Sequence, residues 1–190
     1  MGMSEKIKAC SFTGYRPNKF DFPLSAVSPQ YKEFENRLLS EITAASDGGC
    51  REYFCGMAWG FDILAGEAVI LLKKMRPRDN IKLIAVVPFL GQEKSWDAEW
   101  QRRYSAVLSA ADRVVYISQN YANWAYHKRN RYMVDNSDTV ITFFDGKSGG
   151  TAATLRYAGE KGKRIINLAA EKKNEKIYFS PYIVFDDEDI

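Results

Sequence analysis

Short apolar stretches alternate with amphipathic ones along most of the chain. The apolar stretches are rich in β-branched or aromatic side chains and have turn residues nearby, which predicts strands. They are residues 7–12, 52–55, 82–87, 113–118, 139–144 and 164–169. Between them, apolar residues spaced three and four apart predict helices. The helical patterns are clear over 30–46 and 61–75 and weaker over 97–110, 121–135 and 151–161.

This alternation predicts an α/β fold. Strands that are apolar almost throughout are typical of a parallel sheet covered on both faces. Right-handed crossovers then give a doubly wound, mostly parallel, Rossmann-like sheet flanked by helices. The 190 residues with 46% hydrophobic content predict a single domain over 1–190. Residues 170–190 are interpreted as a charged linker, an extended edge segment and an acidic tail.

Composition narrows the classes of function. The longest apolar runs, such as residues 83–90, are far shorter than a membrane span. Residues 1–12 lack the apolar core of a secretion signal. Three cysteines without a C-x-x-C spacing, together with a single histidine, favour reduced thiols and argue against a zinc site. We therefore expect a cytoplasmic protein with no membrane partner, no bound metal and no cofactor.

The charge is nearly balanced. A formal net charge of +3 and the lack of a long basic stripe argue against nucleic acid as a partner. Basic residues do gather at 73–78, 127–131 and 161–164. The first and third clusters follow predicted helices, where cations complement the carbonyl groups of a helix C-terminus. The middle cluster has no such explanation and stays open, although His127 within it is interpreted as a surface residue.

Glycine-bearing loops follow three of the predicted strands. They are TGYRP at 13–17, GMAWGFD at 56–62 and DGKSGGT at 145–151. Parallel sheets bind ligands beyond the carboxyl ends of their strands. Glycine lets a ligand approach the backbone, and a helix N-terminus suits phosphate. The pattern predicts an anionic, nucleotide-like ligand, contacted by Thr13, Gly14, Arg16, Gly56, Gly60, Gly149, Gly150 and Thr151.

Better-known signatures are absent from the sequence. GKS at 146–148 would need a glycine five residues before Gly146 to be a P-loop, and Ile141 stands there. No G-x-G-x-x-G occurs, so the dinucleotide fingerprint is missing. A Ser/His/Asp triad would have to use the one histidine, and no nucleophile elbow is present.

TGYRP, CGMAWGFDILAGE and RNRYMVDNSDTVITFFDGKSGGT together resemble the SLOG superfamily. The resemblance is closest to its YpsA-like branch, whose function is unknown, and it spans residues 6–168. It implies a Rossmann-like fold that binds nucleotides or nucleotide-derived ligands. The superfamily includes DNA-processing proteins, sensor domains and the LOG phosphoribohydrolases, which cleave the N-glycosidic bond of nucleoside monophosphates. The YpsA-like branch often has histidine in its first motif, where this chain has Tyr15.

The resemblance to LOG enzymes extends to single positions. Their R-K-x-x-M motif matches Arg129, Asn130 and Met133, with asparagine in place of lysine, and their strand-opening aspartate matches Asp138. The match implies that Arg129 and Asn130 also contact the ligand. The LOG G-T pair matches Gly150 and Thr151 if the loop before them is longer.

The acidic pair that LOG enzymes carry after G-T is missing. Ala153 and Thr154 stand in its place, so the carboxylate expected to promote glycosidic cleavage is absent. Asp62 and Glu67 are the acids that could replace it as catalytic residues. At 100° per residue they lie about 140° apart on their helix, on opposite flanks of its apolar stripe. They therefore do not form one carboxylate pair.

Each of these side chains also has a structural interpretation. Asp62 could complement the helix dipole, and Glu67 could lie on a solvated flank. Arg16, held extended by the proline after it, could bind phosphate or pair with an acid. Trp59 and Trp96 could stack on a base or pack in the core.

Three functional hypotheses follow. The first is binding or sensing of a nucleotide or nucleotide-derived ligand at the carboxyl edge of the sheet. The second is an N-glycosidase or phosphoribohydrolase that uses Asp62 or Glu67, and the third is a DNA-processing protein. Whether the chain is an enzyme stays open, and the sequence is compatible with a homo-oligomer without requiring one.

Overall fold

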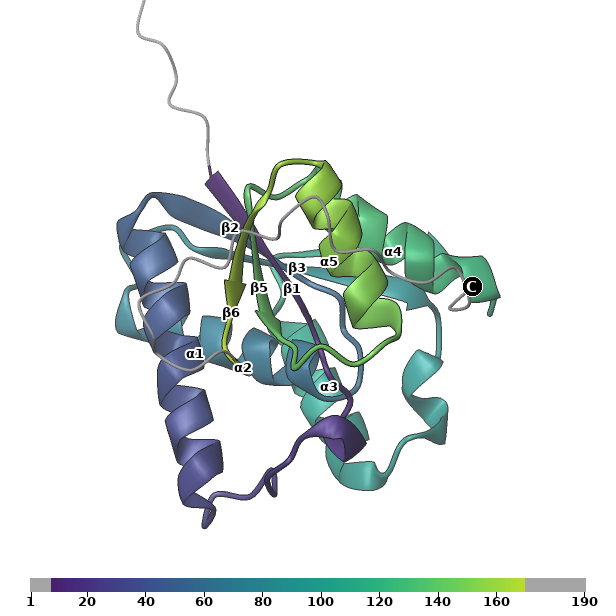
Figure 1. The fold of residues 1–190 in the computed structure, drawn as a ribbon, viewed down its shortest axis with the longest axis horizontal. Helices are drawn as coiled ribbons and strands as arrows, with labels where there is room; N and C mark the ends of the chain where they lie inside the picture. The colour runs from purple at the N-terminus through teal and green to yellow at the C-terminus, as the bar shows by residue number, and fades with distance from the viewer. Residues whose placement is uncertain (1–7, 170–190) are drawn as a thin grey trace, which may run out of the picture.

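The computed structural model describes residues 8–169, so the linker, edge segment and tail predicted for 170–190 lie outside the described residues. A six-stranded parallel sheet forms its centre, in the order β4-β3-β2-β1-β5-β6 (Figure 1). The strands are β1 (Lys8–Gly14), β2 (Cys50–Cys55), β3 (Lys82–Phe89), β4 (Arg113–Ser118), β5 (Thr139–Phe143) and β6 (Arg164–Asn167).

Five α-helices connect these strands. They are α1 (Pro29–Asp47), α2 (Phe61–Met75), α3 (Ala98–Ala110), α4 (Asn123–Asp135) and α5 (Gly150–Glu160). Two short 3-10 helices, η1 (Pro17–Lys19) and η2 (Gln92–Ser95), follow β1 and β3. Helices α1, α2 and α3 pack side by side, and α4 packs on α5. Right-handed crossovers place the first three helices on one face of the sheet and the last two on the other.

The chain order reverses next to β1. Strands β1 to β4 run in sequence toward one edge, and the chain then returns to add β5 on the other side of β1. The gap between β1 and β5 is therefore the switch point of the sheet, where ligands bind in doubly wound folds. This arrangement confirms the predicted fold class.

Helix and strand positions agree closely with the sequence pattern. The predicted segments 61–75 and 113–118 coincide with α2 and β4, and the other bounds differ by at most two residues. The stripe of α1 that includes Tyr31, Phe34 and Leu38 is buried against the sheet and α2. The helix begins where Ser28 accepts a hydrogen bond from the Tyr31 backbone nitrogen at 3.3 Å. The two 3-10 helices are additions that the pattern did not predict.

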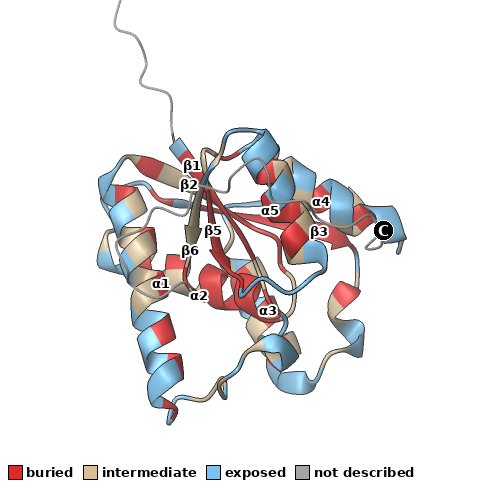
Figure 2. Ribbon diagram, viewed as in Figure 1, coloured by how far each residue is buried: buried red, intermediate tan, exposed pale blue. Residues whose placement is uncertain are grey.

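Burial follows the layers. Buried residues gather on the four inner strands β3, β2, β1 and β5 and on the inner sides of the helices, whereas the edge strands β4 and β6 contain none and the outer helix surfaces are exposed (Figure 2). Among the described residues, no helix combines the length and the apolar character that a membrane crossing requires.

Candidate functional site

The switch point brings together the loops after β1 and β5. Gly14 and Phe143 are the last paired residues of these two strands. The Thr151 hydroxyl donates a hydrogen bond of 3.2 Å to the Gly14 carbonyl, which ties the first turn of α5 to the end of β1. Thr13, one residue earlier, is buried between the strands. Gly14 and Thr151, two of the predicted site residues, therefore meet.

The N-terminus of α5 is open. Gly149 precedes the helix with a φ of 132°, a backbone conformation that favours glycine, and no side chain caps the helix. Gly149 and Gly150 are exposed, and a Cβ added to Gly150 would meet no atom within 4 Å. The first backbone N–H groups of a helix have no partner within it, so they point here toward open space. This is the geometry that binds anions at helix N-termini.

Lys19 lies at this helix end and was missed by the sequence analysis. Its ammonium group is 3.5 Å from the Ser148 carbonyl and 5.6 Å from the centre of the Tyr15 ring. The residue belongs to η1, whose turn brings it back over the β5–α5 loop. Because η1 itself was not predicted, only the position of Lys19 close behind the TGYRP motif hinted at its role.

Tyr15 holds the β5–α5 loop in place. Its hydroxyl hydrogen-bonds to the Asp145 carboxylate, and it accepts from the backbone nitrogens of Asp145 at 3.2 Å and Lys147 at 3.3 Å. Burial, reinforced by the Asp145 contact, raises the pKa of Tyr15. Tyr15 thus fixes the loop that leads into α5.

Two of the predicted glycines serve packing. A Cβ on Gly14 would overlap the Phe61 ring, and one on Gly60 would lie 2.5 Å from the Tyr15 carbonyl oxygen. Gly60 also has a φ of 99°, and the next residue, Phe61, donates its backbone N–H to that carbonyl at 3.0 Å. The loops after β1 and β2 therefore touch directly, and both glycines are required by this contact whether or not a ligand binds.

The side chains of Arg129 and Asp62 meet just beyond the carboxyl end of β2. The Arg129 guanidinium reaches from α4 to the Gly56 carbonyl and lies 3.4 Å from the Asp62 carboxylate of α2. Asp62 also accepts from the Ala58 backbone nitrogen at 3.3 Å. A Cβ on Gly56 would be 2.5 Å from the Asp62 carboxylate and would overlap the guanidinium. Glycine at this position therefore lets the two helical layers join across the sheet edge.

This ion pair is buried and incompletely satisfied. Asp62 is 4% exposed and Arg129 is 5% exposed. Burial raises the pKa of Asp62 to about 6, although the Arg129 charge opposes the rise. Burial likewise lowers the pKa of Arg129. Within residues 8–169 the Arg129 Nε has no hydrogen-bond partner, which is rare for a buried donor.

Arg16 lies near this pair, with its Cα beside Gly60. It is exposed and follows Tyr15, whose carbonyl contacts the start of α2. Burial raises the pKa of Tyr126 in α4, and the nearby charge of Arg16 opposes that rise. The same charge acts on Arg129, whose pKa burial already lowers. Arg16, which the sequence predicted as a ligand contact, is therefore an exposed cation at the carboxyl edge of the sheet.

Asn130 and Thr154 connect α4 to α5. The Asn130 amide donates to the Thr154 hydroxyl at 2.7 Å, and that hydroxyl donates to the Gly150 carbonyl at 2.8 Å. In the comparison with LOG enzymes, Thr154 matches a position of their acidic pair. In this protein its hydroxyl forms hydrogen bonds between neutral groups only.

Glu67 is directed away from Asp62. Its carboxylate forms a bidentate ion pair with Arg103 of α3, with one contact at 2.8 Å, and the Arg103 guanidinium is 4.5 Å from the centre of the Trp100 ring. Asp62 instead faces α4. The separation of the two acids that the helical geometry predicted is present, and each acid has its own cationic partner.

The tryptophans of the two nearby loops contact each other. The Trp59 and Trp96 rings stack with centroids 6.4 Å apart, and Tyr104 packs edge-on against Trp96. The partly buried pair belongs to the margin of the main core.

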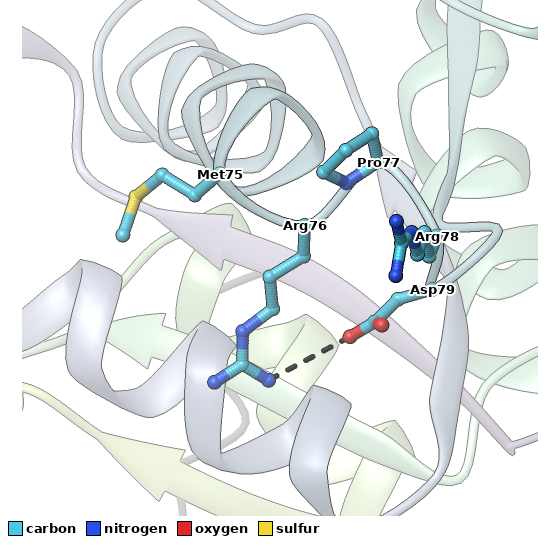
Figure 3. Close-up of a pocket in the computed structure, with 5 residues that line it drawn as sticks. All are labelled: Met75, Arg76, Pro77, Arg78 and Asp79. Carbon is cyan, nitrogen blue, oxygen red and sulfur yellow. Dashed lines mark ion pairs between the residues drawn. The ribbon is translucent and has the colours of Figure 1, made fainter.

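A hollow of about 420 Å³ lies elsewhere, at the C-terminal end of α2 (Figure 3). Met75, Arg76, Pro77, Arg78 and Asp79 line it, and Arg76 is 3.7 Å from the Asp79 carboxylate. This end of α2 is opposite the carboxyl edge of the sheet, so the hollow is separate from the loops described above. In residues 8–169, no three His, Cys, Asp or Glu side chains gather closely enough to hold a metal ion.

The sheet order, the switch point and the glycine-bearing loops define a doubly wound Rossmann-like protein. The family model described as the YspA SLOG family matches residues 10–187. The chain belongs to this family, which confirms the resemblance seen in its motifs.

The chain is also similar to known proteins in sequence and to solved structures in fold. The uncharacterised SPbeta prophage-derived protein YoqJ of Bacillus subtilis (strain 168) is 31% identical over 118 residues, which cover 56% of this chain and 68% of YoqJ. DNA processing protein A (DprA) of Streptococcus pneumoniae superposes with a TM-score of 0.57 and 17% identity, over 89% of this chain and 53% of that one. The chain thus spans about half of the pneumococcal protein.

The DprA of Helicobacter pylori is similar in the same way. It superposes with a TM-score of 0.59 and 18% identity, over 89% of this chain and 68% of that one, and is described by its single-stranded DNA binding mode. At this level of identity, both likenesses show a shared fold.

Proposed function

We propose that this protein binds a nucleotide or nucleotide-derived ligand through a phosphate group at the N-terminus of α5. The observation that carries the proposal is the uncapped, glycine-led and exposed start of that helix at the switch point. Lys19 supplies positive charge beside it, and Arg16 is an exposed cation directly after Tyr15, whose hydroxyl contacts the loop before the helix. The buried Arg129 Nε, which has no hydrogen-bond partner within residues 8–169, adds support for an anion at this sheet edge.

The predicted residues divide into two roles in this proposal. Gly149, Gly150 and Thr151 present backbone N–H groups to the phosphate, and Arg16 and Lys19 neutralise it. The remaining predicted residues hold these groups in position: Thr13, Gly14, Gly56, Gly60, Arg129 and Asn130.

A thermal-shift screen tests the proposal. Nucleoside monophosphates, diphosphates and nucleotide sugars are compared with the same nucleosides lacking phosphate. A ligand present at 100 times its Kd stabilises the folded state by about 2.7 kcal/mol, which is several degrees for a domain of this size. Only phosphate-bearing compounds are expected to raise the melting temperature.

Matched variants locate the site. Gly150→Val places a branched side chain over the N–H groups, whereas Gly159→Val makes the same change in open space near the other end of α5. Arg16→Ala removes the exposed cation. Gly150→Val and Arg16→Ala are expected to abolish the shift and Gly159→Val to keep it. A shift that survives both site variants, or no shift with any compound, refutes the proposal.

A hydrolase of nucleoside monophosphates is the second candidate. One observation favours it: a buried carboxyl, Asp62, whose pKa is raised to about 6 and which could therefore exchange a proton near neutral pH. Release of free base from nucleoside 5′-monophosphates, followed by chromatography, tests this activity. Asp62→Asn is then expected to stop release and Glu67→Gln to leave it unchanged. No release by the parent, or equal release by Asp62→Asn, rules the candidate out.

A further inference from the structure

The outer surface of α4 and α5 carries a second group of residues, away from the α5 N-terminus. It includes Lys128 and Arg131 from the basic cluster 127–131, which the sequence left unexplained. We call it the α4 stripe, and its members are Tyr121, Trp124, Lys128, Arg131, Tyr157 and Lys161. Figure 1 shows α4 and α5 side by side, and Figure 2 shows the outer side of α4 as exposed.

Aromatic rings and cations alternate along the stripe. Positions 124, 128 and 131 lie on one side of α4, as spacings of four and three residues require. The Lys128 ammonium is 5.3 Å from the centre of the Trp124 ring, and the Arg131 guanidinium is 5.0 Å from the centre of Tyr157. Lys161 lies on the same tyrosine at 5.2 Å. The contacts form two groups, Trp124 with Lys128 and Tyr157 with Arg131 and Lys161, and the spacing of Lys128 and Arg131 along α4 places them on the same side.

Two of the three aromatic rings of the stripe are unusually accessible, and the third, Tyr157, is partly buried. Trp124 is 54% exposed and Tyr121 is 65% exposed. Large aromatic side chains are normally buried, and exposed groups of them mark interaction surfaces. Tyr121 packs edge-on against Phe89 at the end of β3, with ring centroids 5.2 Å apart, so the stripe begins at the carboxyl edge of the sheet.

The stripe is also positive. No aspartate or glutamate occurs between residues 119 and 134. The acid of α4, Asp135, accepts a hydrogen bond of 2.9 Å from the Tyr157 hydroxyl and lies 3.7 Å from Lys161. The net charge of +3 argued against nucleic acid as a partner, but it is a sum over the whole chain and does not show this local excess of positive charge.

We propose that the α4 stripe binds single-stranded nucleic acid. Bases stack on Trp124 and Tyr121, and backbone phosphates pair with Lys128 and Arg131. Alternating aromatic and basic side chains suit this ligand because every base offers a π face and every linkage a negative charge. A duplex hides its base faces, so it would use only the cations. A second copy of the chain fits poorly, because a two-fold contact through the stripe would bring two positively charged surfaces together. The proposal goes beyond nucleotide binding at α5 and does not require it.

Fluorescence anisotropy with a labelled oligothymidylate tests the proposal at low salt. Trp124→Ala is expected to weaken binding about 5- to 150-fold, the range found for loss of one base–aromatic stack. Lys128→Ala with Arg131→Ala is expected to lower the slope of log K against log salt by about 1.4, since each phosphate contact to a single strand contributes about 0.7. A duplex of the same length is expected to bind more weakly than the single strand.

Controls separate the stripe from folding and from the α5 site. Lys32→Ala with Lys74→Ala removes two exposed cations from α1 and α2, on the other face of the sheet, and is expected to bind as the parent does. Arg16→Ala distinguishes the two proposals, because it should abolish nucleotide stabilisation and leave oligonucleotide binding intact. Circular dichroism confirms that each variant folds.

Three results would overturn the inference. They are an oligothymidylate that does not bind at low salt, equal affinity of Trp124→Ala and the parent, and a duplex bound as tightly as the single strand. A dimer that Trp124→Ala converts to a monomer, without any oligonucleotide binding, would assign the stripe to self-association instead.

Discussion

The buried carboxyl of Asp62 predicts a particular pH dependence of stability. Its pKa rises from an ordinary value of 3.8 to about 6 in the folded protein, because burial penalises its charge more than Arg129 stabilises it. Between these two values the folded state keeps a proton that the unfolded state has lost. The free energy of unfolding therefore falls as the pH rises through this window. The stabilisation is complete below pH 4 and lost above pH 6.

The magnitude follows from the size of the shift. A difference of about 2 pKa units corresponds to about 3 kcal/mol, of which about 2–3 kcal/mol is lost between pH 4 and pH 7. Asparagine at position 62 keeps the shape of the side chain and cannot titrate. The difference in unfolding free energy, Asp62→Asn minus parent, is expected to grow by that amount over the interval. Every other titrating group is common to both proteins and largely cancels.

Urea denaturation at half-unit steps of pH measures this difference. Asp21→Asn, at an exposed aspartate, is the matched control and is expected to follow the parent at every pH. The reasoning fails if the difference between Asp62→Asn and the parent stays constant or shrinks as the pH rises. That outcome would mean that Arg129 keeps Asp62 ionised, so that pairing outweighs burial.

Three further substitutions have defined outcomes. Gly56→Ala is expected to lower the free energy of unfolding by about 1–3 kcal/mol, measured by urea denaturation, because its methyl group would lie 2.5 Å from the Asp62 carboxylate. A loss below about 0.5 kcal/mol would show that the Asp62–Arg129 ion pair moves aside freely. Glu67→Gln is expected to reduce the free energy of unfolding by about 1 kcal/mol, because it weakens the ion pair with Arg103. The nucleotide thermal shift should stay unchanged, and its loss would show that Glu67 belongs to the ligand site. Tyr15→Phe removes the hydroxyl that holds the β5–α5 loop. It is expected to lower the free energy of unfolding by about 1 kcal/mol and to speed tryptic cleavage of that loop. An unchanged cleavage rate would contradict this role of Tyr15.

The periodicity of the sequence was enough to predict the fold. Strands buried on both faces and helices with one buried stripe are local patterns, and α2 shows why they succeed. Its apolar positions, among them Leu64 and Leu72, repeat at helical spacing and are buried as that spacing requires. The same geometry separated Asp62 from Glu67, and the structure gives each a partner on a different helix.

The meaning of individual polar residues and glycines was harder to predict. Gly14 and Gly60 look like ligand-loop glycines in sequence, and their packing role depends on neighbours from other loops. Lys19 reaches α5 through a short 3-10 turn that leaves no periodic signal. Arg129 crosses to α2 from 67 residues away, which no local pattern records. These features arise from tertiary contacts, so only the structure can supply them.

The contact of Gly56, Asp62 and Arg129 has a consequence for how the family can diverge. A side chain at position 56 would occupy the space of the guanidinium, and losing either charge would strand the other in the interior. None of the three can therefore change alone at low cost. Among related sequences, these positions are expected to covary: a larger residue at 56 should accompany uncharged residues at both 62 and 129. Frequent single exchanges among them would show that the two helical layers do not depend on this junction.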